Sequence, residues 1–324
     1  MNFARKQGVA IMVRNIRIHP LLLRSLFFAG SLVLAGCTSV KKAAVNQVAD
    51  ALASGGTTFA ADDDPELVKQ AVPFSLKLME SLLSENPRHQ KLLLATCSGF
   101  TQYAFAFVQQ DADELEATNY AQAEALRVRA KKLYRRARDY GLRGLEVAHA
   151  GWTAKLAVDP RATLKTATKA DVPLLYWTAA AWGAYISASK DEPSAIGEMV
   201  QVEALIDRAL ELDEAWGDGT LHSLLITLEM SRTGAAGKAE DRARQHFERA
   251  VALAHGAQAG PLVTFAESVC VETHNVAEFQ QLLEQALKVD VDQKPEYRLA
   301  NLVLQRRARW LLNRKDDLFF SPQK

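Results

Sequence analysis

The chain has 324 residues, of which 48% are hydrophobic and 24% are charged, so it is long enough for one large domain or two small ones with a well-buried core. Lys and Arg number 39, and Asp and Glu number 38. Five basic residues and no acidic residue fall within residues 1–36, which leaves 34 basic and 38 acidic residues in the rest of the chain. This balance excludes the large positive excess that is typical of nucleic-acid-binding proteins.

The first 36 residues have the pattern of a secretory signal peptide. Residues 1–24 are polar and basic, and the apolar run LFFAGSLVL follows at residues 26–34. Because a transmembrane helix needs about 20 apolar residues, this run favours a cleaved signal peptide over a membrane span. Leu-Ala-Gly-Cys comes next and resembles the bacterial lipobox, which predicts that Cys37 begins the mature chain and carries a lipid.

Lipidation of Cys37 predicts a protein held at a membrane in the periplasm. Several acyl chains, at about 0.8 kcal/mol per buried methylene, make such attachment effectively permanent. In bacterial lipoproteins an aspartate after the cysteine favours retention at the inner membrane. Thr38 stands at this position, so we expect the outer membrane. The alternative is an ordinary cleaved signal peptide with an incidental cysteine.

After the signal peptide we expect residues 37–63 to form a lipid anchor and spacer, and residues 64–320 to form a helical-repeat domain. A short helix ends in the spacer at a glycine-rich break. Asp64 and Pro65 then supply an N-cap and a proline at the first helical position. This pair predicts a helix that runs to about Leu83.

Two later segments are rich in aromatic side chains. The helix expected after Asn86-Pro87 places Phe100, Tyr103 and Phe107 on one face, and a second aromatic helix opens near Pro173. Tyrosine and tryptophan combine an apolar body with a polar tip, so the rings could line a cavity for an apolar or amphipathic ligand. Packing in the core is the alternative. The cavity hypothesis predicts a ligand-binding set of Tyr103, Phe107, Trp177, Trp182 and Tyr185.

Residues 115–147 predict one long helix, or two helices joined near Gly141 and Gly144. Arginine crowds the outer face of this segment. We interpret the face as a solvated surface with ion pairs to Glu124 and Asp139. Its arginines are Arg127, Arg129, Arg135, Arg136, Arg138 and Arg143.

The stretch VEALIDRALEL at residues 202–212 contains an apolar stripe at helical spacing that recurs along the chain. The aligned alanines are 36 or 41 residues apart, or two times 36, which are helical-repeat periods. A large apolar residue three positions before an alanine is typical of the second helix of a tetratricopeptide repeat, where the small residue lets two helices approach closely. We therefore predict an all-α fold without a sheet, an α-solenoid of antiparallel helix pairs with divergent tetratricopeptide-like repeats. The aligned residues are Ala137, Ala209, Ala250 and Ala286.

The sequence lacks the common catalytic and metal-binding motifs. It contains no GxxxxGK[ST], no HExxH and no GxSxG. Cys270 and His274 could share one helix face, but a zinc site needs three or four ligands. We therefore predict no enzyme, no cofactor and no metal. For Cys97 and Cys270 we expect buried free thiols, with a disulfide as the alternative.

The combined segments are similar to the TatT family, the accessory T-components of tripartite ATP-independent periplasmic (TRAP) transporters. The resemblance extends from the lipobox to about Phe319. It depends on the order of DDDPELV at residues 62–68, SGFTQYAF at residues 98–105 and WGDGTLHS at residues 216–223, since a single repeat would be generic.

This resemblance implies an all-helical periplasmic lipoprotein that assembles as a homotrimer, with a pore or cleft in each protomer. It also implies association with the substrate-binding P-component of the transporter and help in transferring a small organic or apolar ligand to it. It brings no catalytic motif. A general envelope assembly scaffold, which would bind proteins or peptides through its repeats, is the alternative function.

Overall fold

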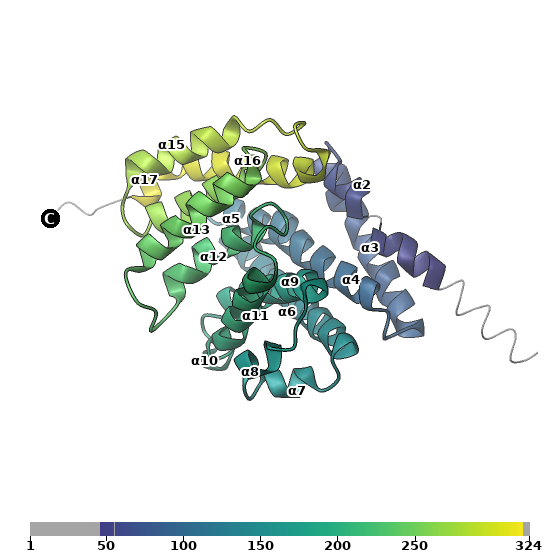
Figure 1. The fold of residues 1–324 in the computed structure, drawn as a ribbon. Coiled ribbons are helices and arrows are strands. Elements are labelled where there is room, and N and C mark those ends of the chain that lie inside the picture. Colours follow the sequence, from purple (N-terminus) through teal and green to yellow (C-terminus); the bar gives the residue numbers. More distant parts are fainter. Residues whose placement is uncertain (1–45, 55, 320–324) are drawn as a thin grey trace, which may run out of the picture. The chain divides into compact units, whose positions relative to one another are not determined.

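Helices follow one another along all the residues that the computed structural model describes, 46–54 and 56–319 (Figure 1). No strand occurs in this part of the chain, which confirms the all-α prediction. The predicted signal peptide and Cys37 lie outside the described residues. The longer helices are α3 (Pro65–Glu85), α4 (Gln90–Tyr103), α6 (Tyr120–Ala148), α9 (Val172–Ser187), α11 (Met199–Leu212), α12 (Thr220–Ser231), α13 (Ala239–Ala254), α15 (Val276–Leu287) and α16 (Arg298–Asn313).

Short elements connect these helices. Residues 46–54, which belong to the predicted spacer, are helical, and Ala49 among them is buried against α3 and α4. The other short helices are α2 (Gly56–Ala60), α5 (Gln110–Leu115), α7 (Trp152–Leu156), α8 (Pro160–Leu164), α10 (Pro193–Ile196), α14 (Gly260–Phe265) and α17 (Lys315–Leu318). The remaining turns are the 3₁₀ segments η2 (Lys169–Asp171) and η4 (Pro295–Tyr297) and the π-helical segments η1 (Ala104–Gln109) and η3 (Ala266–Cys270).

Local sequence signals explain where the first long helices begin. Asp64 accepts hydrogen bonds from the backbone N–H groups of Glu66 and Leu67, and Pro65 occupies the first turn of α3 as predicted. The prediction that Asn86-Pro87 opens the next helix is wrong by a few residues. A turn comes first, and α4 begins after His89, whose Nδ1 accepts from the Leu92 N–H.

The four aligned alanines are completely buried. Ala137, Ala209, Ala250 and Ala286 each have 0% of their surface exposed, as expected for small residues between helices. Consecutive long helices contact each other, α4 with α6, α6 with α9, and α9 with α11. At the contact of α6 with α9, a Cβ on Gly141 would lie 2.4 Å from the Thr178 Oγ1. Larger side chains at these positions would force the helices apart.

Helix α16 returns to the N-terminal part of the body. It contacts α2 and α3 (Figure 1). Two of its arginines, Arg306 and Arg307, form ion pairs with acidic residues of α5. Arg307 is 5% exposed and also pairs with Glu267 of η3. Because a buried charge is costly unless it is paired, these acidic partners stabilise Arg307 in its buried position.

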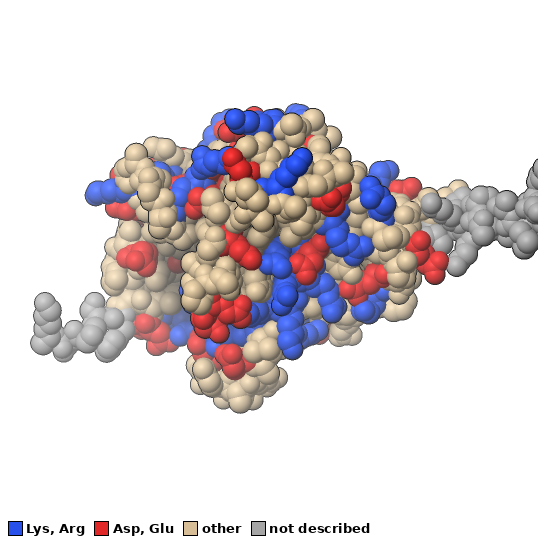
Figure 2. All heavy atoms as spheres, turned by 90° about the horizontal axis from the view of Figure 1, so that it is seen from below, with Lys and Arg blue, Asp and Glu red and all other residues tan. Residues whose placement is uncertain are grey.

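The two cysteines of the described body are free and buried. Cys97 lies in α4 and Cys270 in η3, and burial raises the pKa of each thiol to about 12. They therefore behave as small apolar residues, as predicted. On the outside, basic and acidic side chains are interspersed over the face shown in Figure 2.

Candidate ligand-binding cavity

An apolar cavity of about 620 Å³ lies between the N-terminal helices and α16. Helix 46–54, α2, α3, α4 and η1 line it from the N-terminal part of the body, and α9, Trp216, η4 and α16 complete the wall. This volume falls within the range of about 300–1,000 Å³ that is typical of sites for small organic molecules.

The side chains of α3 and α4 account for the apolar character of the wall. Val72, Leu76 and Met79 of α3 face the cavity, because apolar residues recur on one side of this helix. Gly99 of α4 lies opposite, where a Cβ would be only 2.8 Å from the Leu76 Cδ2. Glycine at this position therefore allows α3 and α4 to pack closely beside the cavity. From the other side, Leu299, Ala300, Val303 and Leu304 of α16 close the wall.

Aromatic rings form two further parts of the wall. Tyr103 and Phe107 contribute rings whose centres lie 5.7 Å apart, and the Arg129 Nη2 donates to the Tyr103 hydroxyl at 3.4 Å. Trp177 packs edge-on against Tyr176 at 4.9 Å, and Tyr176 in turn lies 5.0 Å from Trp216. These rings offer large apolar faces with few hydrogen-bonding atoms.

Polar groups are sparse in the cavity wall. Among the described residues that line it, Lys91 and Glu296 alone are charged. Lys91 also lies 3.5 Å from the Asp50 carboxylate, with which it forms an ion pair. Serine hydroxyls of Ser75 and Ser98 supply a few hydrogen-bonding positions. The wall therefore suits a small molecule that is mainly apolar and carries few polar groups.

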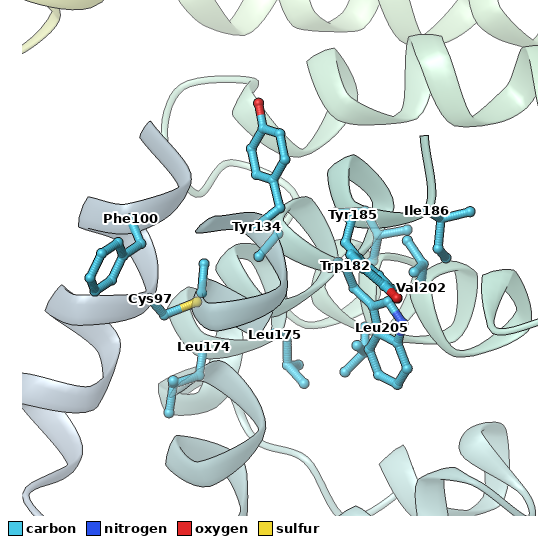
Figure 3. Packing of buried hydrophobic residues seen from close by; sticks show 14 of the residues in the cluster. Cys97, Phe100, Tyr134, Leu174, Leu175, Trp182, Tyr185, Ile186, Val202 and Leu205 are labelled. Atoms are coloured by element: carbon cyan, nitrogen blue, oxygen red, sulfur yellow. The ribbon is translucent and has the colours of Figure 1, made fainter. Parts of the chain in front are cut away.

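The structure brings together three of the five aromatic residues that the sequence singled out. Tyr103, Phe107 and Trp177 line the cavity. Trp182 and Tyr185 do not line it. Figure 3 shows both among the packed side chains of the core, near residues of α11.

Specific contacts hold Trp182 and Tyr185 in that core. Trp182 is 7% exposed, and its Nε1 donates to a carboxylate oxygen of Glu198 at 2.7 Å. The Tyr185 hydroxyl donates to Glu192 at 3.3 Å. The guanidinium of Arg138 lies 5.5 Å from the Trp182 ring and 4.9 Å from the Tyr185 ring. With their polar tips and ring faces occupied, these two residues belong to packing rather than to the cavity.

Sequence reasoning missed the contribution of α16 and of Trp216. Both lie far from the N-terminal helices in the chain. A local sequence pattern cannot predict a contact between segments so distant in sequence.

A second group of polar side chains, centred on the buried His222, lies where α12 meets α13. The Nδ1 atoms of His222 and His246 are 2.8 Å apart, and the His222 Nε2 lies 3.1 Å from Glu214. Hydrogen bonds from Arg249 lower the pKa of Glu214 to about 2, so Glu214 is a carboxylate. His222 therefore donates from Nε2 and accepts from the His246 Nδ1–H. Burial lowers the pKa of both histidines.

The described residues contain neither a metal-binding cluster nor a membrane-spanning helix. No group of three or more His, Cys, Asp or Glu side chains in residues 46–319 is arranged to hold a metal ion. Within the same described part of the chain, no helix is both long and apolar enough to cross a membrane.

Comparison with known proteins identifies the family of this chain. The TAtT family, described as the TRAP transporter T-component, matches residues 61–319. An uncharacterized protein of Treponema pallidum (strain Nichols) is 30% identical over 318 residues, which cover 90% of this chain and 96% of that protein. The family match includes the cavity-lining helices from α3 to α16. The chain therefore belongs to the family of TRAP transporter T-components.

Proposed function

We propose that the protein is a periplasmic lipoprotein that serves a TRAP transporter by docking its substrate-binding P-component and assisting the transfer of a small, mainly apolar ligand. Membership of the T-component family supports the role in transport. The observation that carries the proposal is the cavity of about 620 Å³, because its wall is apolar and contains few polar groups. In this proposal Tyr103, Phe107 and Trp177 contact the ligand.

The remaining parts of the proposal concern location and assembly. Residues 1–36 act as the signal peptide, residues 37–63 as lipid anchor and spacer, and residues 64–320 as the repeat domain. Lipid on Cys37 holds the protein at the outer membrane, and the helix pairs of an α-solenoid provide the surface that binds the P-component. The functional unit is a homotrimer. Replacing Cys37 with Ser should abolish palmitate labelling and membrane fractionation, and retained label would contradict the anchor.

Capture of the P-component tests the docking role. The full-length protein, tagged at its C-terminus and extracted from membranes with mild detergent, should retain one dominant periplasmic partner. Mass spectrometry should identify this partner as a TRAP substrate-binding protein. If the captured proteins instead belong to lipoprotein or cell-wall assembly, the transport role is wrong and the scaffold function is correct.

A further inference from the structure

Helix α6 carries a row of cations along its outer side. Lys132, Arg136 and Arg143 follow one another at spacings of four and seven residues, which places them on one side of the helix, and Arg135 lies beside them. All four are exposed. We call Lys132, Arg135, Arg136 and Arg143 the basic face. Together with Asp139 and Tyr140 these residues surround a shallow depression of about 300 Å³.

Much of the positive charge of the basic face has no acidic partner among the described residues. Neighbouring cations on α6 are paired, Arg127 with Glu116 and Arg138 with Glu198. By contrast, no carboxylate of the described residues lies within ion-pair distance of Lys132 or Arg135. The predicted ion pairs of this face with Glu124 and Asp139 are present and are formed by Arg127 and Arg138, whereas Arg135 forms none with the described residues.

The other two members of the basic face are only weakly engaged. Arg136 lies 3.6 Å from Glu80 and 5.4 Å from the centre of the Phe100 ring. Arg143 donates to the Pro87 carbonyl and lies over the ring of Tyr140. The single acidic residue of the depression, Asp139, already binds Arg138. The basic face therefore has a net positive charge and guanidinium groups that remain accessible.

The described chain begins near the Arg143 end of this face. The Asn86 Nδ2 donates to the Oδ1 of Asn46, the first described residue, at 2.7 Å. The following residue, Pro87, accepts the hydrogen bond from Arg143 at 3.2 Å. Nine positions separate Asn46 from Cys37, and nine residues of chain span at most about 30 Å even when fully extended. A lipid on Cys37 would therefore keep this side of the body close to the membrane.

We propose that the basic face binds the headgroups of anionic phospholipids in the membrane that holds Cys37. This inference rests on the proposed lipidation, which determines that the face meets a membrane. Lys and Arg near an anionic bilayer each contribute about 1 kcal/mol, and guanidinium groups match the geometry of phosphate. The tether keeps the face at high effective concentration, so a weak interaction is sufficient to orient the body.

Vesicle binding by a chain without lipid tests the proposal independently of the anchor. Residues 46–324 form one compact unit, and a chain of residues 38–324 contains the whole of it. We expect co-sedimentation with vesicles of an equal mixture of phosphatidylglycerol and phosphatidylcholine, and none with pure phosphatidylcholine. Raising the salt concentration should weaken the binding, because salt screens exposed charges.

A matched pair of variants locates the binding surface. Lys132→Gln with Arg135→Gln should weaken binding to the anionic vesicles on the order of tenfold. Lys238→Gln with Lys288→Gln removes the same charge from exposed positions elsewhere and should have little effect. Thermal melting of both double variants confirms that each remains folded.

Three results would overturn the proposal. The first is no binding to anionic vesicles, and the second is equal loss in both double variants, which would indicate a general effect of net charge. The third is unchanged vesicle binding with loss of P-component capture by the Lys132 and Arg135 variant, because the face would then bind a protein. If the wild type is not labelled with palmitate, Cys37 carries no lipid and the proposed anchor is wrong. Vesicle binding by residues 38–324 is a separate measurement, so it still tests whether the basic face binds anionic headgroups.

Discussion

Trp177 and Trp182 lie on the same helix, α9, but have different surroundings. Trp177 is half-buried and lines the cavity, whereas Trp182 is buried, hydrogen-bonded to Glu198 and covered by Arg138. The sequence singled out both because each is aromatic on an apolar helix. It could not separate them, since the side that α9 turns toward the cavity depends on the contacts of α9 with α6 and α11.

Truncating the two tryptophans should therefore affect different properties, mainly stability for Trp182 and mainly ligand binding for Trp177. Trp182→Ala should lower the free energy of unfolding by roughly 3–5 kcal/mol, as expected for loss of a large ring from a packed site. Trp177→Ala should cost less stability and should weaken binding of a fluorescent fatty acid such as cis-parinaric acid. Urea unfolding and a fluorescence titration measure the two quantities. A larger loss of stability in Trp177→Ala would contradict the assignment.

The histidine pair makes stability depend on pH. Burial lowers the pKa of His222 and His246 below their value in the unfolded chain, so the unfolded state binds more protons below about pH 6.5. Stability from this pair is therefore fully present above about pH 6.5 and is lost as the pH falls toward the lowered pKa values. We expect the Tm to fall between neutral pH and mildly acidic pH.

A double variant provides the control for the histidine prediction. His222→Gln with His246→Gln cannot titrate, so its Tm should change much less over the same pH range. Equal pH dependence in the wild type and the double variant would show that other groups cause the loss.

Among the elements, helix positions and their buried stripes were largely predictable. Asp64-Pro65, the aligned alanines and the apolar spacing all act locally, and these signals match α3, α6, α11, α13 and α15. The π-helical segments η1 and η3 were not predictable, because an α-helix and a π-helix have nearly the same sequence preferences. A π-helical turn holds more residues than an α-helical turn. The side chains within and after it, including Phe107 of η1, therefore point in other directions than α-helical spacing predicts.

The small-residue positions provide the test at this scale. Ala250 of α13 is completely buried, and its backbone lies beside Gly219, where a Cβ would come within 2.8 Å of the Ala250 carbonyl oxygen. Ala250→Leu should cost roughly 1–3 kcal/mol of stability because it overpacks this contact. Ala252 is exposed on the same helix, and Ala252→Leu should be close to neutral. If thermal melts rank the two variants in the opposite order, the repeat register is wrong.

For the whole molecule, the return of α16 to the N-terminal helices was the least predictable feature. Ion pairs such as that of Arg307 with Asp113 connect α16 to these helices, although the two residues are 194 positions apart in the chain. A local sequence pattern cannot predict such contacts. The family resemblance implied a cleft, but the residues of α16 that close it come from this long-range packing.

Removing the buried cation of α16 should therefore destabilise the whole body. Arg307→Met leaves the carboxylates of Asp113 and Glu267 without their partner, and breaking a buried pair in this way typically costs about 3–5 kcal/mol. Arg309→Met changes an exposed arginine of the same helix and should cost little. Urea unfolding of both variants gives the comparison. Equal stability of the two variants would show that the ion pairs do not hold α16.

Occlusion of the cavity tests the proposed ligand site most directly. Ser75 of α3 lines the cavity, and Ser81 is exposed on the same helix, so Ser75→Trp and Ser81→Trp place the same ring inside and outside. Titration with cis-parinaric acid should show saturable binding to the wild type and to Ser81→Trp, and binding weaker on the order of tenfold to a folded Ser75→Trp. Absence of saturable binding to the wild type, or unchanged binding to Ser75→Trp, would contradict a ligand site in this cavity.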